Sequence, residues 1–218
     1  MSATVLLVGG FGNLGGRIAA HLGSLGDHHL VLASRRKRDA PDWAKSAQTI
    51  QLDLTDQGSF SSIPKSVNCI IQLAGTNDFD SAQNPELAHR VTAEGTAALL
   101  NNAVNNGIER FIYFSTAHVY GAPLAGHFTE ETPTNATHPY ATTHLDAESA
   151  VGAAHDRGDI VGIRVRLSNG FGRPVAYETA DWRTLTSDLC RQAVLEKRME
   201  VRTDGLQERN FITKTDIA

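Results

Sequence analysis

The sequence predicts a doubly wound α/β fold built on a parallel sheet. Short continuous apolar segments, typical of strands buried on both faces, alternate over the first 166 residues with segments whose apolar residues recur at helical spacing. The first apolar segment also runs directly into a cluster of glycines that opens a helical segment. Strands alternating with helices form βαβ units, and right-handed crossovers arrange such units as a doubly wound sheet.

The individual elements of this sheet can be placed in order. Strands are expected at residues 4–8, 30–33, 49–52, 67–73, 110–114 and 160–166. A first helix carries Leu14, Ile18, Leu22 and Leu25 on one face. A long helix begins at Pro85 and stops before Gly107, and another covers residues 140–155. Residues 121–139 contain three prolines and are expected to form a loop.

The pattern changes after Arg166. Residues 168–174 resemble a turn-rich junction, followed by a helix at 184–195 and a short strand at 199–202. Residues 216–218 look like the first turn of a helix that has nothing to pack against. We therefore expect a first domain over residues 1–166 and a small, incomplete second domain over 167–218, so that the chain is a fragment or its second domain is unusually short.

Composition narrows the class of protein. The chain is 41% hydrophobic and 20% charged with a net charge of −4, which argues against a general binder of nucleic acid or acidic membranes. No apolar stretch approaches the ~20 residues that span a bilayer, and no cationic leader precedes the first strand. Cys69 and Cys190 form no CxxC pair and are expected to be reduced thiols of a cytoplasmic protein.

The glycine cluster predicts a site for NAD(P). It reads Gly9-Gly10-Phe11-Gly12-Asn13-Leu14-Gly15. In the Rossmann arrangement the first glycine permits a tight turn, the second lets the backbone approach a pyrophosphate, and the third lets helix and strand pack closely. The free N–H groups and dipole at the helix start then hold the anion.

The choice between NAD and NADP is usually made about 20 residues beyond the glycines. That point falls at Ser34, Arg35 and Arg36, where two guanidinium groups would suit a 2′-phosphate. The sequence therefore favours NADP, with NAD as the alternative, although the same residues could form a solvated basic turn. Asp53 and Leu54, which close the third strand, are placed to meet the adenine edge.

Two further segments carry a family resemblance. Residues 111–121, Phe-Ile-Tyr-Phe-Ser-Thr-Ala-His-Val-Tyr-Gly, and residues 139–148, Pro-Tyr-Ala-Thr-Thr-His-Leu-Asp-Ala-Glu, accompany the glycine cluster. Together with the motifs at 107–111, 166–169 and 205–212, they resemble the extended short-chain dehydrogenase/reductase family. Its NAD-dependent epimerase/dehydratase group acts on nucleotide-activated sugars.

The resemblance implies a role for several residues. Thr116 corresponds to the hydroxyl that hydrogen-bonds the reacting oxygen, Tyr140 to the general acid/base, and His144 to the position usually held by lysine. Asn169 and Arg209 correspond to contacts of the substrate diphosphate, and Leu73, Ala74 and Gly75 to the strand end beside the cofactor. Residues 1–166 would then bind NAD(P), and residues 167–218 would begin the substrate-binding domain.

Two positions depart from the family pattern. Tyr140 and His144 are four residues apart and therefore share a helix face. A lysine there would lower the tyrosine pKa by about 1–3 units, whereas histidine is mostly neutral at pH 7 and would chiefly hydrogen-bond the nicotinamide ribose. Thr92 stands where the family usually has asparagine. The sequence therefore predicts cofactor binding more firmly than it predicts catalytic turnover.

Three hypotheses follow. The first is an epimerase or reductase of a nucleotide sugar; a dehydratase ranks lower, because Ala117 and His118 stand where many 4,6-dehydratases carry an acid. The second is an NADP(H)-binding sensor or scaffold with little activity. The third is a reductase of another small carbonyl compound. The spacing of the histidines fits no metal motif, and the resemblance implies a homodimer that pairs the helices at 85–106 and 140–155.

Overall fold

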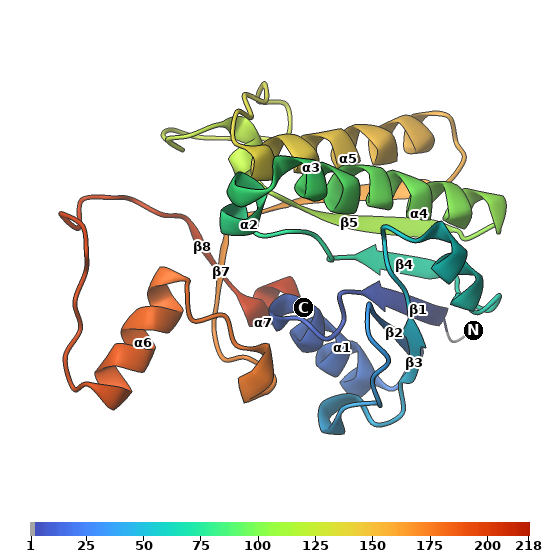
Figure 1. Cartoon of the computed structure of the whole chain (residues 1–218), viewed down its shortest axis with the longest axis horizontal. Coiled ribbons are helices and arrows are strands. Elements are labelled where there is room, and N and C mark those ends of the chain that lie inside the picture. Colours follow the sequence, from blue (N-terminus) through green and yellow to red (C-terminus); the bar gives the residue numbers. More distant parts are fainter. Residues whose placement is uncertain (1–2) are drawn as a thin grey trace.

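The computed structural model describes residues 3–218 and confirms the doubly wound fold (Figure 1). Its main sheet is six-stranded, with order β3-β2-β1-β4-β5-β6 and all neighbouring pairs parallel. The order reverses between β1 and β4, which is where such sheets bind ligands. The strands are β1 (Ala3–Val8), β2 (His28–Ser34), β3 (Gln48–Gln51), β4 (Cys69–Gln72), β5 (Arg110–Thr116) and β6 (Val161–Leu167).

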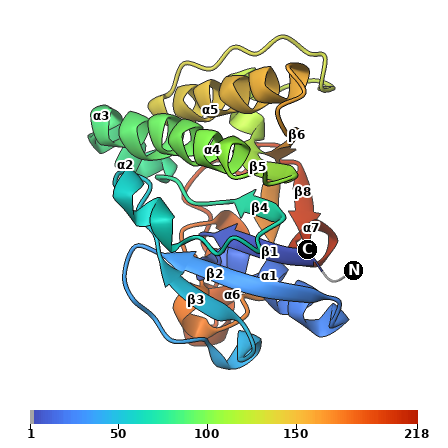
Figure 2. The ribbon, with the colours of Figure 1, turned by 90° about the vertical axis from the view of Figure 1, so that its right-hand side faces the viewer.

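Helices cover both faces of the sheet (Figures 1 and 2). Alternate residues of β1 show the division: Leu6 and Val8 pack into one apolar core with α4 and α5, and Val5 and Leu7 into another with α1. The helices are α1 (Asn13–Leu25), α2 (Asp78–Gln83), α3 (Pro85–Ala88), α4 (Gly95–Asn105), α5 (Pro139–Asp156), α6 (Leu185–Leu195) and α7 (Lys214–Ile217). None of those described is long and apolar enough to cross a bilayer.

The long helix expected from Pro85 is not uniform. The short helix α2 precedes it, and a π-helical segment, His89–Glu94, lies between α3 and α4. Within that segment Thr92 is completely buried. A π-helical turn inside a helix is frequent at functional sites, and here it turns Thr92 toward the loop that follows β4.

The C-terminal part differs most from the expectation. The junction at 168–174 contains a strand, β7 (Asn169–Phe171), which pairs in parallel with β8 (Phe211–Thr213). The strand expected at 199–202 is wrong: these residues form no strand, and Met199 and Val201 are exposed. The last helix, α7, does have a partner, because it packs on α1 and Arg17 of α1 donates a hydrogen bond to Thr215.

Candidate functional site

Two glycines of the loop that joins β1 to α1 have no room for a side chain. Gly9 has φ +89°, and a Cβ atom there would lie 3.0 Å from the backbone nitrogen of Ala74. A Cβ atom on Gly15 would collide with the carbonyl oxygen of Gly9. Gly12 is the N-cap of α1, no side chain caps that end, and the first turn contains no acidic residue. The loop therefore fits the pyrophosphate of a dinucleotide, which needs free N–H groups and a close backbone.

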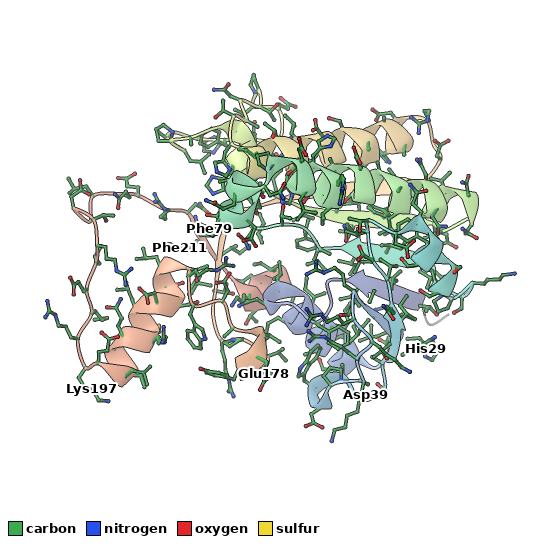
Figure 3. The ribbon with its side chains drawn as sticks, viewed as in Figure 1. His29, Asp39, Phe79, Glu178, Lys197 and Phe211 are labelled. Carbon is green, nitrogen blue, oxygen red and sulfur yellow. The ribbon has the colours of Figure 1, made fainter. Side chains whose placement is uncertain are left out.

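A cavity of about 490 Å³ lies beside this loop. Phe11, Gly12 and Asn13 line one side, and residues 178–183 of the later chain line the other (Glu178 is labelled in Figure 3). Phe11 also meets the edge of Trp43, while Leu14 packs against the core beneath. Two distant parts of the chain thus border an open cavity next to the predicted phosphate site.

The predicted ribose and adenine residues lie at the ends of β2 and β3. The side chains of Arg35 and Arg36 are exposed. Asp53 accepts hydrogen bonds from the backbone and hydroxyl of Thr55, and these bonds, with the nearby Arg35, lower its pKa. Leu54 is buried, and its side chain limits the space at Gly95, so it belongs to the core.

The end of β4 forms the wall opposite the glycine loop. Leu73 and Ala74 are the backbone neighbours of Gly9. The Thr92 hydroxyl accepts a hydrogen bond of 3.2 Å from the Thr76 backbone and restricts the space beside Gly75. The residue that departs from the family pattern therefore supports the loop that the resemblance assigns to the cofactor.

Thr116 and Tyr140 come together at the same edge of the sheet. Thr116 ends β5, and Tyr140 lies in the first turn of α5. Burial raises the pKa of the Tyr140 phenol; a hydrogen bond with the Thr116 hydroxyl acts to lower it, and the carboxylate of Asp78 to raise it. The net shift is upward, so the phenol is protonated near pH 7.

His144 lies one turn further along α5 and is buried. The rings of Tyr140 and His144 meet edge to face, with centroids 4.6 Å apart. Burial lowers the pKa of His144 to about 4, although Glu148 acts to raise it. His144 is therefore a neutral imidazole and provides no cation to stabilise a Tyr140 phenolate.

Buried polar partners of this helix face were not identified from the sequence. The hydroxyl of Tyr113, a residue of the apolar strand β5, lies 2.7 Å from Nδ1 of His144. Glu148, one turn beyond His144, forms a buried ion pair of 2.7 Å with Arg166, whose guanidinium also binds the hydroxyl of Tyr120. All three contacts join residues more than 15 positions apart, so no local pattern indicates them.

His118, which was not among the predicted site residues, also lies beside Tyr140. Its ring meets the Tyr140 ring edge to face at 6.3 Å. Loss of hydration lowers the pKa of His118; Asp78 acts to raise it, while Arg209 and His138 act to lower it. His118 thus lies against Tyr140 and within electrostatic range of Arg209. No cluster of His, Cys, Asp or Glu within residues 3–218 is suited to hold a metal ion.

The predicted diphosphate contacts lie at the two-stranded sheet. Asn169 begins β7, and its side-chain amide donates a hydrogen bond of 3.0 Å to the Asn210 carbonyl. The pairing of β7 with β8 brings Asn169 beside Phe211, two residues from Arg209. Both side chains are exposed. Asn169, on β7, and Arg209, just before β8, therefore lie near each other although they are 40 positions apart.

Comparison with known proteins identifies the family and the fold of the chain. Residues 5–218 match the model of the NAD dependent epimerase/dehydratase family. Among curated relatives, the chain is 34% identical over 127 residues to dTDP-D-glucose 4,6-dehydratase of Mus musculus, covering 58% of this chain and 34% of that protein. It is 29% identical over 160 residues to UDP-glucose 4-epimerase 4 of Oryza sativa subsp. japonica, covering 67% of this chain and 43% of that protein. The chain thus spans less than half the length of these relatives.

Solved structures show the same fold. The structure described as MoeE5 in complex with UDP-glucuronic acid and NAD has a TM-score of 0.83 at 25% identity, over 99% of this chain and 69% of that one. UDP-glucuronic acid 4-epimerase from Bacillus cereus, solved with UDP-glucuronic acid and NAD, has a TM-score of 0.79 at 20% identity, over 98% of this chain and 70% of that one.

Proposed function

The chain belongs to the NAD dependent epimerase/dehydratase family, and from this premise we propose that it transfers a hydride between a nicotinamide cofactor and a carbon of a nucleotide-activated sugar. The observation that carries the proposal is the convergence of Thr116, Tyr140 and the glycine loop at one edge of the sheet. In an open α/β sheet this edge, at the reversal of strand order, is where ligands bind.

Each group of site residues has its own role in the proposed reaction. The glycine loop would hold the cofactor pyrophosphate, with Leu73, Ala74 and Gly75 forming the opposite wall. When bound, the nicotinamide supplies or accepts the hydride. Thr116 hydrogen-bonds the reacting oxygen, Tyr140 moves the proton on that oxygen, and His144 orients the nicotinamide ribose. Asn169 and Arg209 bind the diphosphate of the substrate.

Arg35 and Arg36 make NADP the cofactor we favour over NAD. Both guanidinium groups are exposed at the end of β2, and no ion pair is found for either within residues 3–218. Replacing both by alanine should weaken NADP(H) binding about 10–100-fold and leave NAD(H) binding unchanged, since charge-assisted hydrogen bonds contribute roughly 1.5–3 kcal/mol. Lys37→Ala, in the same basic segment, is the control. Equal losses for both cofactors would contradict the assignment.

Epimerisation and reduction are the reactions we rank first. Both begin with a hydride transfer that Tyr140 can serve, and the named relatives include a 4-epimerase and a 4,6-dehydratase. His118 stands two positions after Thr116, where many 4,6-dehydratases carry an acid, so a dehydratase ranks lower. Arg209→Glu tests the substrate class: it should abolish binding of a nucleotide sugar, whereas the affinity for a small carbonyl substrate without a diphosphate would be unchanged.

The decisive experiment is Tyr140→Phe. After mass spectrometry of the native protein has identified any co-purified cofactor or sugar, the protein is assayed with a panel of nucleotide sugars in two ways. Net consumption or formation of NADPH reports reduction or oxidation, and chromatography of the product sugar reports epimerisation, which regenerates the cofactor and leaves no net change in NADPH. Removing the hydroxyl should lower turnover about 10²–10⁴-fold, the usual contribution of a general acid/base, while NADP(H) affinity persists. Unchanged turnover would refute the mechanism.

A second candidate function is a cofactor-binding module with little catalysis. It is favoured by the pKa of about 4 for His144, which leaves Tyr140 without a neighbouring cation. The variant His144→Lys distinguishes the enzyme from the cofactor-binding module. A large gain in turnover would indicate an enzyme whose activity the histidine has weakened. If no nucleotide sugar is turned over by either form while NADP(H) still binds, the chain is a sensor or scaffold.

We also propose a homodimer formed through α4 and α5. The two helices lie side by side on one face of the sheet (Figure 2), where a second copy could add an equivalent pair. Sedimentation velocity at micromolar concentration distinguishes the dimer from a monomer of 23.5 kDa.

A further inference from the structure

The chemistry of two buried side chains at the site determines which of them donates the hydrogen bond between them. Tyr113, on β5, and His144, on α5, are only 1% and 7% exposed. The Tyr113 hydroxyl lies 2.7 Å from Nδ1 of His144, and the two rings are tilted by 36° with centroids 5.7 Å apart. Either atom is able to donate, depending on which ring nitrogen carries the proton.

The protons on the two groups can be counted. Burial raises the pKa of Tyr113 well above 10, and Tyr140 and Glu148 act in the same direction, so the phenol keeps its hydrogen. Burial lowers the pKa of His144 to about 4, so its ring carries one proton. Two hydrogens are therefore shared among three positions: the phenol oxygen, Nδ1 and Nε2.

Only one arrangement satisfies the buried hydroxyl. His144 Nδ1 is the hydrogen-bond partner found for the Tyr113 hydroxyl within residues 3–218. If Nδ1 carried the imidazole proton, that N–H would donate to the phenol oxygen, and the phenol hydrogen would be buried without an acceptor. Buried donors are rarely left unpaired, because each loses its hydration without compensation. The phenol therefore donates to Nδ1.

We infer that Tyr113 is a positioning residue which holds His144 as the tautomer protonated at Nε2, and that this Nε2–H is a neutral donor for a ribose hydroxyl oxygen. The second half of the inference rests on the proposed function, since it needs a nicotinamide ribose at the site. The His144 ring is suitably placed, because it packs against the ring of Tyr140. A single neutral donor then acts where the family usually has the cation of a lysine.

The tautomer is measured without any ligand. Two-bond ¹H–¹⁵N correlation of the full 218-residue chain, with ¹⁵N-labelled histidine and His144→Gln for assignment, separates protonated from unprotonated ring nitrogens. At pH 7 we expect His144 to be protonated at Nε2 alone. Protonation at Nδ1, or at both nitrogens, would overturn the inference. The wild-type spectrum decides this even if a variant fails to fold.

Tyr113→Phe then tests the role of the hydroxyl. It should release Nδ1 and give a mixture of tautomers, whereas Tyr177→Phe, at a residue that is 77% exposed, should leave the spectrum unchanged. An unaltered pattern in Tyr113→Phe would contradict the role of Tyr113.

Cofactor affinity tests the ribose contact separately. We expect Tyr113→Phe to weaken NADP(H) binding about tenfold, and Tyr177→Phe to have no effect. If the wild-type tautomer is as inferred but Tyr113→Phe binds NADP(H) normally, the ribose contact is refuted. If the wild-type chain binds no dinucleotide at all, the proposed function fails while the tautomer assignment stands.

Discussion

The neutrality of His144 sets the pH dependence that we expect for turnover. Tyr140 has a raised pKa, because burial outweighs its hydrogen bond with Thr116. Oxidation of an alcohol needs the phenolate, so its rate should still be rising above pH 9. His144→Lys would add a cation next to the phenol and move the inflection about 1–3 pH units lower. NADP⁺ contributes its own charge equally in both proteins, so the difference between their pH–rate profiles reports residue 144 alone.

The same histidine should make the fold sensitive to acid. Its pKa is about 4 in the folded chain, against about 6.5 unfolded, so the unfolded state binds more protons between these values. The contribution of His144 to the free energy of unfolding is therefore at its full value above pH 6.5. It falls by about 3 kcal/mol as the pH is lowered toward 4, because the unfolded chain then binds a proton that the folded chain does not. Urea unfolding from pH 7 to 4 should show a smaller loss for His144→Asn than for wild type. His127→Gln, at an exposed residue, is the control and should follow the wild-type curve.

Single residues of the site were predictable where a local motif carries them. Thr116, Tyr140 and His144 were predicted from the family resemblance that two local motifs carry, and the structure brings them together. The role of Tyr113 was not predictable, because an aromatic residue in an apolar strand is typical of the core. Its contact with His144 spans 31 positions and exists only once α5 packs on β5.

The glycine loop provides a test at the scale of one element. Gly15→Ala would press a methyl group against the Gly9 carbonyl oxygen, where backbone, and not a flexible side chain, must move. We expect a loss of about 1–3 kcal/mol in the free energy of unfolding, as for overpacking, and at least tenfold weaker NADP(H) binding.

Gly23 in the same helix is the matched control for this substitution. A Cβ atom there meets only the Leu30 side chain, at an ordinary distance of 3.6 Å. Gly23→Ala should stabilise the chain by up to about 1 kcal/mol through helix propensity and leave cofactor affinity unchanged. Equal cofactor affinity in the two variants would show that the loop does not hold the pyrophosphate.

The strands of the main sheet and the helix α6 after it were predictable, whereas the strands after the main sheet were not. The six strands lie within two residues of their predicted ends, because each is a compact apolar segment bounded by polar or glycine residues. β7 and β8 are three residues each and depend on a partner about 40 positions away, which no local pattern indicates. Residues 199–202 alternate in polarity like a strand, but no strand lies beside them and their apolar side chains are exposed.

At the scale of the whole molecule, the proposed cofactor site joins two parts of the chain. The glycine loop belongs to the main sheet, whereas residues 178–183 follow β7, and together they line the cavity of about 490 Å³. The fold class was predictable because alternation of strands and helices is a property of the whole sequence. The proximity of the glycine loop to residues 178–183 was not predictable, because it depends on how the chain returns across the loop.

A ligand in this cavity should therefore stabilise the folded chain as a whole. NADP(H) at one hundred times its dissociation constant adds about 2.7 kcal/mol to the free energy of unfolding, which for a chain of this size raises Tm by roughly 5–10 °C. Differential scanning calorimetry, run over a series of NADP(H) concentrations, measures this shift. A nucleotide sugar added afterwards should raise Tm further only in a chain that keeps Arg209, because that contact lies on the second part of the chain. No shift with any dinucleotide would refute the cofactor site, whereas a shift with NADP(H) but none with nucleotide sugars would favour the cofactor-binding module over the enzyme.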